Sequence, residues 1–107
     1  GGLDASYAPG DGEEATCVSE VRMTGESTFL ESGTITFGGG NSLHFSTVGE
    51  GYMGPSPDAK LSHGAISWRI DRGEGQFDGA TGLITSNFSI SDTGAIVDNH
   101  FGTIFLK

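Results

Sequence analysis

Two residues near the C-terminus have the types and the spacing of an acid–base pair. Asp98 and His100 are two positions apart in a run with the composition of a β-strand, so their side chains should share one face. A carboxylate beside an imidazole can fix the tautomer of the ring and increase its basicity, which makes His100 a candidate general base and Asp98 its partner. The alternatives are that both side chains face solvent, or that His100 is a hydrogen-bonded interior group.

Two further polar residues are candidates for orienting a substrate. Asn87 lies in the preceding apolar run, and the short turn Asp92-Thr93-Gly94 should place the two runs side by side, so that the amide can meet the pair across a hairpin. Arg69 alternates with the apolar residues of its own run and faces away from them, where its guanidinium can bind a carboxylate. The competing interpretations are an ordinary edge-strand residue for Asn87 and a rim residue for Arg69.

Three aromatic residues are candidates for the wall of an apolar site. Tyr52 lies just before the proline-rich segment 54–58, and Phe45 and Trp68 lie in strand-like runs. Large aromatic side chains commonly line cavities that hold small molecules. In a small β domain most of them fill the core instead, and that is the competing interpretation.

The sequence predicts neither a metal site nor a cofactor site. His44, His63 and His100 are three imidazoles that together could hold Zn²⁺, but no His-x-His pair and no Glu-x-x-His motif is present. The glycine-rich segment 73–82 is followed by a strand-like run, whereas a phosphate loop is followed by a helix.

Alternation of apolar and polar residues predicts antiparallel strands from Thr16 onward. A short helix over residues 13–24 is the alternative for the first of them, but β-branched residues there favour a strand. The last run is apolar on both faces, which predicts that it is covered on both sides. Six or seven strands without a long helix favour a small antiparallel barrel of six to eight strands. After the first, the predicted strands cover residues 33–37, 42–52, 62–70, 83–91 and 95–106.

The segment Gly73-Glu74-Gly75-Gln76-Phe77-Asp78-Gly79-Ala80-Thr81-Gly82 predicts a compact turn that directs its phenylalanine inward. It resembles the Gly-x-Gly-x-Phe-x-Gly-Ala-x-Gly stretch of the allene oxide cyclase and dirigent barrels, and the resemblance covers residues 73–107. It implies an eight-stranded calycin-type barrel with an apolar cavity, usually in a homo-oligomer. Members of the group guide the cyclisation or coupling of reactive organic intermediates. The resemblance assigns no catalytic residue.

The composition limits the class of protein. The 107 residues suffice for one domain, and we expect a flexible acidic arm over residues 1–15 and a β-barrel domain over residues 16–107. The net charge of −9 repels phosphate backbones, so nucleic acid is not an expected partner. No apolar run approaches the roughly 20 residues of a membrane-spanning helix, so no membrane partner is expected. Cys17, the single cysteine, excludes an internal disulfide and suggests a cytoplasmic location, unless a signal peptide has been removed.

These observations lead to one functional hypothesis and one rival. In the first, the barrel encloses a small apolar organic molecule and acts as an isomerase or cyclase, without a cofactor, by holding the substrate in a reactive conformation. His100 and Asp98 then perform acid–base catalysis, and Asn87 and Arg69 orient the substrate. The rival is a non-catalytic ligand-binding or oligomeric barrel, which an interior void well under about 300 Å³ would favour.

Overall fold

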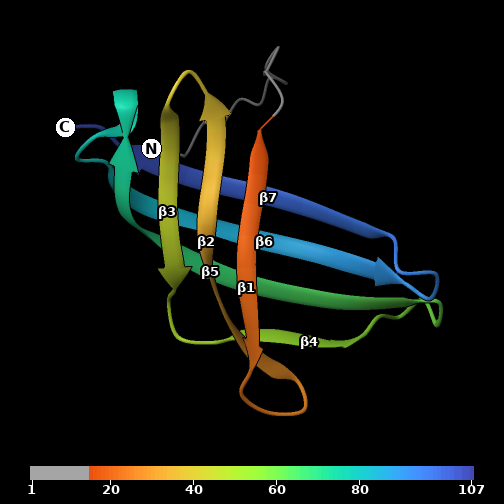
Figure 1. The fold of residues 1–107 in the computed structure, drawn as a ribbon. Coiled ribbons are helices and arrows are strands. Elements are labelled where there is room, and N and C mark those ends of the chain that lie inside the picture. Colours follow the sequence, from red (N-terminus) through yellow and green to blue (C-terminus); the bar gives the residue numbers. More distant parts are fainter. Residues whose placement is uncertain (1–14) are drawn as a thin grey trace, which may run out of the picture.

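The computed structural model describes residues 15–107, which form an all-β structure (Figure 1). One short turn of 3₁₀ helix accompanies seven strands, and no helix among these residues has the length and apolarity that crossing a membrane requires. The predicted all-β antiparallel class is confirmed. In chain order the elements are β1 (Thr16–Met23), β2 (Thr28–Gly38), β3 (Asn41–Thr47), β4 (Gly51–Pro55), β5 (Leu61–Glu74), η1 (Gly75–Phe77), β6 (Thr81–Ser91) and β7 (Ile96–Phe105).

All seven strands belong to one antiparallel sheet with the order β1-β2-β3-β5-β6-β7. β4 pairs with β2 and with β5, so it continues the path of β3 between the same two neighbours after a break at residues 48–50. A register shift between β3 and β5 makes Asp71 an extra residue, and such a bulge bends a strand. Figure 1 shows the result: β1, β2 and β3 cross in front of β5, β6 and β7, so the sheet folds over itself.

The core lies between the two crossing halves of the sheet. Buried residues recur at every second position over residues 64–70 of β5 and at Ile84 and Ser86 of β6, as the alternation predicts. At the centre the rings of Phe45 and Trp68 stack with 4.1 Å between their centroids, and Trp68 is only 1% exposed. The buried apolar residues are Phe29, Ile35, Leu43, Phe45, Ile66, Trp68, Ile70, Ala80 and Ile84.

The end strands of the sheet are β1 and β7, and no backbone pairing joins them within residues 15–107. The described strands therefore form an open path rather than a closed ring of hydrogen bonds. The observed seven strands fall within the predicted six to eight. All of them lie within the predicted domain of residues 16–107, whereas the predicted arm over residues 1–15 falls outside the described residues except for Ala15.

Several strand boundaries differ from the prediction. Residues 16–23 form a strand and not the alternative helix. β2 begins at Thr28 rather than at residue 33, because Phe29 is a buried core residue and pairs with both β1 and β4. The run over residues 42–52 is interrupted at residues 48–50, and β4 extends through Pro55, which a strand tolerates at its last position.

The prediction that the last strand is covered on both sides is wrong for the described residues. Phe101 is 77% exposed on the outer face of β7, and Val97 and Phe105 on the same face are also exposed. β1–β3 cross the inner face of the sheet, so within residues 15–107 no element is left to pack against the outer one (Figure 1).

Residues 73–82 form the predicted compact turn at the end of β5. Gly75 has a φ of +67°, a conformation that disfavours any side chain, and a Cβ at Gly73 would collide with the carbonyl of Phe77. The ring of Phe77 packs against that of Phe37 with 5.3 Å between centroids. The turn thus directs its phenylalanine inward, as predicted.

Candidate functional site

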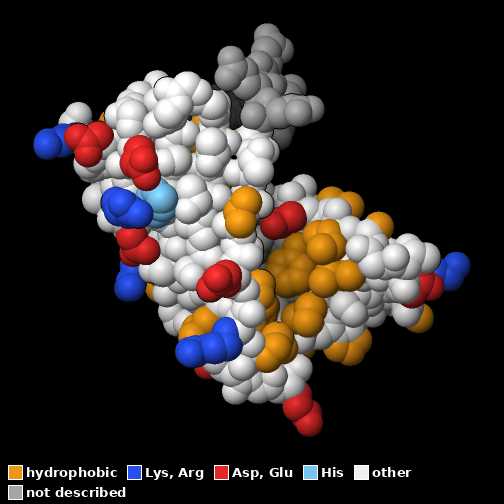
Figure 2. Space-filling view, viewed as in Figure 1, with side chains coloured by type: hydrophobic (Ala, Val, Ile, Leu, Met, Phe, Trp, Pro, Cys, Tyr) orange, Lys and Arg blue, Asp and Glu red, His pale blue; other side chains and the backbone are white. Residues whose placement is uncertain are grey.

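An apolar groove opens between the two crossing halves of the sheet, and we call it the inner groove. Its volume is about 240 Å³. In Figure 2 hydrophobic side chains gather beside β1, over the parts of β5–β7 that β1–β3 leave uncovered, with an acidic side chain at the margin. The residues that line the inner groove are Val21, Met23, Phe29, Glu31, Met53, Ser86, Phe88, Ile90, Ile96 and Asp98.

Strand periodicity explains why these side chains converge. On β1, β2, β6 and β7 the lining residues are two positions apart, so each strand presents one face to the inner groove. The groove exists because β1 and β7, the end strands, do not pair with each other within residues 15–107. Side chains that a closed sheet would hide therefore remain accessible.

Asp98 forms the polar end of the inner groove. Its Oδ1 accepts a hydrogen bond from the Ser86 hydroxyl at 2.6 Å, and its Oδ2 lies 2.9 Å from Nε2 of His100. Ser86 is 1% exposed, and a buried hydroxyl costs free energy unless it is hydrogen-bonded. Ser86 pairs directly with His100 in the register of β6 and β7, so one hairpin positions all three side chains.

The predicted pairing of Asp98 with His100 is therefore present in the structure. When Nε2 carries the proton that Asp98 accepts, Nδ1 keeps its lone pair and can accept a proton from another molecule. The His100 ring meets Trp68 edge-on, with centroids 4.9 Å apart and planes at 80°, and this packing fixes its orientation. His100 does not itself line the inner groove; it is linked to it through Asp98.

Glu31 is a second carboxylate in the inner groove, and the sequence analysis missed it. Its Oε2 accepts a hydrogen bond from the Ser19 hydroxyl of β1 at 2.6 Å. Cys17 lies on the same strand, and partial desolvation, followed by the negative charges of Glu31 and Asp98, raises the pKa of its thiol. The negative charges of both carboxylates therefore affect the same thiol, which lies on the end strand β1. The alternation of Phe29 with Glu31 was the available signal, but no predicted strand covered residues 24–32.

The raised pKa of Cys17 predicts slow alkylation. Because only the thiolate reacts, the midpoint of the iodoacetamide rate against pH should lie higher in the folded protein than in the protein unfolded by urea. Asp98→Asn removes one of the two negative charges and should lower the folded midpoint, whereas Glu20→Gln should leave it unchanged. Identical midpoints in folded and unfolded protein would contradict the raised pKa of the thiol, and an unchanged midpoint in Asp98→Asn would contradict this placement of the carboxylates.

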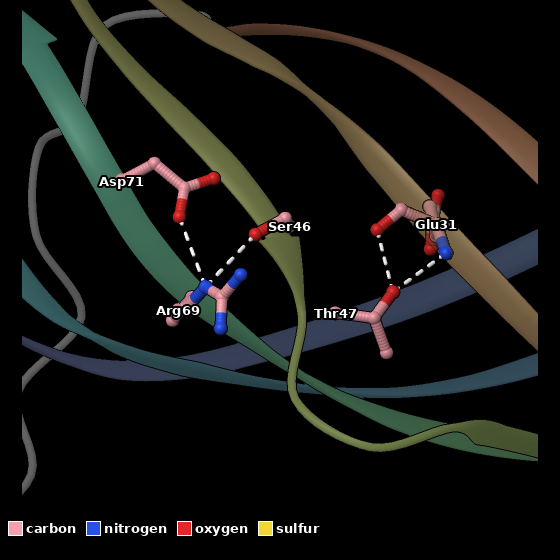
Figure 3. Close-up of polar contacts among 5 residues, drawn as sticks. All are labelled: Glu31, Ser46, Thr47, Arg69 and Asp71. Carbon is pink, nitrogen blue, oxygen red and sulfur yellow. Dashed lines mark hydrogen bonds and ion pairs between the residues drawn. The ribbon is translucent and has the colours of Figure 1, made fainter.

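The structure does not bring Asn87 and Arg69 to the pair. Asn87 pairs with Asn99 and lies on the outer face of the sheet, whereas Asp98 lines the groove on the inner face. Arg69 also faces outward, where its Nε donates to Asp71 at 3.0 Å and to Ser46 at 3.1 Å (Figure 3). A role for either residue in orienting a substrate beside His100 has no geometric support.

Figure 3 also shows how β2 and β3 stay joined where their backbone pairing ends. The Thr47 hydroxyl donates to the Glu31 carbonyl and accepts from the Glu31 amide, both at 2.6 Å. These two bonds hold the Glu31 backbone at the point where β2 leaves β3 to pair with β4. The carboxylate of Glu31 is thus attached to a fixed position of the sheet.

The three predicted wall residues do not line the inner groove either. Phe45 and Trp68 are buried in the core, as the competing interpretation expected, and Tyr52 is exposed. Trp68 nevertheless contacts the site, because its buried ring packs against the ring of His100. The apolar walls come instead from aliphatic, methionine and phenylalanine side chains. These residue types are equally common in a core, so the sequence alone does not show that they line a groove.

Each of the three histidines contacts different side chains, and none contacts another histidine among the described residues. His44 bonds to Thr34 at 3.0 Å and to Glu74 at 2.5 Å, and the hydrogen bond to His44 is the main cause that lowers the pKa of Glu74. His63 contacts the Ser56 hydroxyl at 3.1 Å. Among residues 15–107 no three His, Cys, Asp or Glu side chains are placed to hold a metal ion.

Comparison with known proteins gives no relative from which a role for these residues could be transferred. The chain matches no protein-family model, no curated protein and no solved structure.

Proposed function

We propose that the inner groove binds a small, mainly apolar organic molecule whose polar group meets Asp98. The observation that supports this most is the combination of apolar walls with a carboxylate held by Ser86 and His100. Small-molecule sites are typically apolar concavities with a few fixed polar groups. The volume of about 240 Å³ is slightly below the usual range, so a compact ligand, or one end of a longer one, fits the groove.

Isomerase or cyclase activity is a second candidate function, and the Asp98–His100 pair favours it. A neutral imidazole held in one tautomer can take a proton from a bound molecule and return it elsewhere. The groove would contribute by holding a flexible substrate in one folded conformation, which lowers the entropic part of the barrier. This activity agrees with the resemblance of residues 73–107 to the allene oxide cyclase and dirigent barrels, and we extend the proposal to a barrel of that type that is open between β1 and β7.

A groove-filling substitution tests the binding proposal. Val21→Trp places a bulky ring in the inner groove and should weaken binding of the neutral dye N-phenyl-1-naphthylamine by about tenfold or more, equivalent to about 1.4 kcal/mol. Val18→Trp is the matched control, because Val18 is exposed on the opposite face of the same strand. Fluorescence titration measures both. Equal affinities in the two variants, or no binding by the unsubstituted protein, would refute the proposal.

We also propose that the outer face of β6 and β7 contacts a second copy of the chain. Leu83, Val97, Phe101 and Phe105 are exposed on this face. No Asp, Glu, Lys or Arg is present among its residues, although the chain has a net charge of −9. Two strongly acidic copies repel each other least where both surfaces are uncharged and apolar.

The contact between copies predicts a concentration-dependent oligomer. Phe101→Lys places a charge at the centre of the outer face and should shift the protein to monomer, because two such lysines would face each other across the contact. Val18→Lys, an exposed position of β1, should not change the assembly. Sedimentation velocity distinguishes the species, and a purely monomeric unsubstituted protein at high concentration would refute the contact.

A further inference from the structure

Both charged side chains that line the inner groove are acidic. Glu31 comes from β2 and Asp98 from β7, whereas none of the five Lys and Arg residues of the chain lines the groove. The remaining lining residues are apolar except for Ser86. The groove thus combines an apolar surface with negative charge.

The hydrogen-bond partners of these carboxylates leave much of that negative charge uncompensated. Glu31 is bonded by the Ser19 hydroxyl, which is neutral, and its Oε1 has no hydrogen-bond partner among the described side chains. Asp98 is bonded by the Ser86 hydroxyl and by the His100 ring. The His100 ring contacts Asp98 and not Glu31, so no basic side chain is bonded to Glu31 among the described residues.

An apolar ligand that fills the groove removes water from these carboxylates. Desolvating a carboxylate is costly unless another charge or hydrogen-bond donor replaces the water. A neutral hydrocarbon supplies neither, and an anionic head group adds repulsion. A ligand with a cationic head group replaces the lost hydration of the carboxylates with an opposite charge, while its apolar body displaces water from the walls.

We propose that the inner groove selects amphipathic cations, namely molecules with an ammonium head group and a short apolar body. The proposal rests on the proposed binding function of the groove and specifies its ligand class. The head group lies between Glu31 and Asp98, and the apolar body contacts Phe29, Phe88 and Ile90. The net charge of −9 favours the approach of such ligands, and the effect of both carboxylates on Cys17 agrees with their proximity to a common point.

A matched ligand series tests this selectivity. Octylammonium, 1-octanol and octanoate share one apolar chain and differ only in the charge of the head group. We expect octylammonium to bind about tenfold more tightly than 1-octanol, which corresponds to about 1.4 kcal/mol, and octanoate to bind most weakly. Calorimetric titration at low ionic strength gives the three affinities, and added salt should reduce the difference.

Glu31→Gln should bring the affinities of octylammonium and 1-octanol close together, because it removes the charge and keeps the shape of the side chain. Glu20→Gln makes the same change of net charge on the outer face of β1 and should leave the preference intact. Equal loss of preference in the two variants would attribute the effect to net charge and overturn the assignment to the groove.

The outcomes separate this inference from the proposed function. Tighter or equal binding of 1-octanol relative to octylammonium overturns the cation preference and leaves the apolar groove as a binding site. Absence of binding by all three ligands refutes the proposed function and the inference with it. Because the ligand series uses the unsubstituted protein, it decides the question even if Glu31→Gln fails to fold.

Discussion

Trp68→Ala is expected to cost about 3–5 kcal/mol of unfolding free energy, the range for removing a large buried aromatic side chain. Trp68 is 1% exposed, its ring stacks on Phe45, and it also supports the edge of the His100 ring. Small domains have only about 5–15 kcal/mol of stability in total, so the variant should be largely destabilised. Urea unfolding followed by circular dichroism measures the loss.

Trp68→Phe is the matched control for this prediction. The indole Nε1 is buried and has no hydrogen-bond partner among the described residues. A phenyl ring keeps much of the packing and removes that unsatisfied donor, so this variant should lose much less stability than Trp68→Ala. Similar losses in the two variants, or a loss below about 1 kcal/mol for alanine, would contradict the placement of Trp68 at the centre of the core.

Asp98→Ala is expected to cost about 1–3 kcal/mol, because it leaves the buried hydroxyl of Ser86 without its acceptor. Ser86→Ala removes the hydroxyl itself, so the double variant should lose less than the sum of the two single losses. The coupling should be about 0.5–3 kcal/mol, as found for residues in one hydrogen-bond network. Urea unfolding of the four proteins completes the cycle.

Asp92→Ala is the control for the cycle, since Asp92 is an exposed residue of the turn that joins β6 to β7. It should change stability by no more than about 0.5 kcal/mol, as is usual for exposed positions. Strict additivity of Asp98→Ala and Ser86→Ala would show that the two side chains do not interact in solution. The polar end of the groove would then lack the fixed geometry that the proposed acid–base chemistry requires.

Local features of the site were predictable from the sequence, because they depend on spacing within one strand. Asp98 and His100 are two residues apart, and any β-strand places such a pair on one face. The inward direction of Phe77 was predictable for a similar reason, since the surrounding glycines permit few other turns.

Features that depend on pairing between strands were not predictable. Asn87 was expected to meet Asp98, but the register of β6 and β7 places Asn87 opposite Asn99, on the outer face. A shift of one residue in register exchanges the two faces of a strand, and the turn sequence alone did not determine which face of β6 the pair would share. Glu31 was missed because the first residues of β2 become a strand through their pairing with β1 and β4. β1 is joined to β2 by a loop, and β4 is distant in sequence, so neither pairing was visible in the local pattern.

The exposure of β7 shows a further limit. Apolar residues on both faces predict burial on both faces, yet Phe101 and Phe105 are exposed within the described residues. The pattern is the same whether another part of one chain or a second copy covers the face. The apolar pattern of β7 alone therefore does not determine whether its outer face is buried within one chain.

The two methionines of the chain allow the most direct test of the inner groove as a ligand site. Met23 and Met53 both line it, so a protein labelled with ¹³C at the methionine methyl groups gives two signals, both from the groove. Titration with N-phenyl-1-naphthylamine should shift both signals with one shared affinity, because the rings of the dye would lie beside them. Two unmoved signals at a dye concentration that saturates the fluorescence would show that the dye binds elsewhere and would contradict the proposed site.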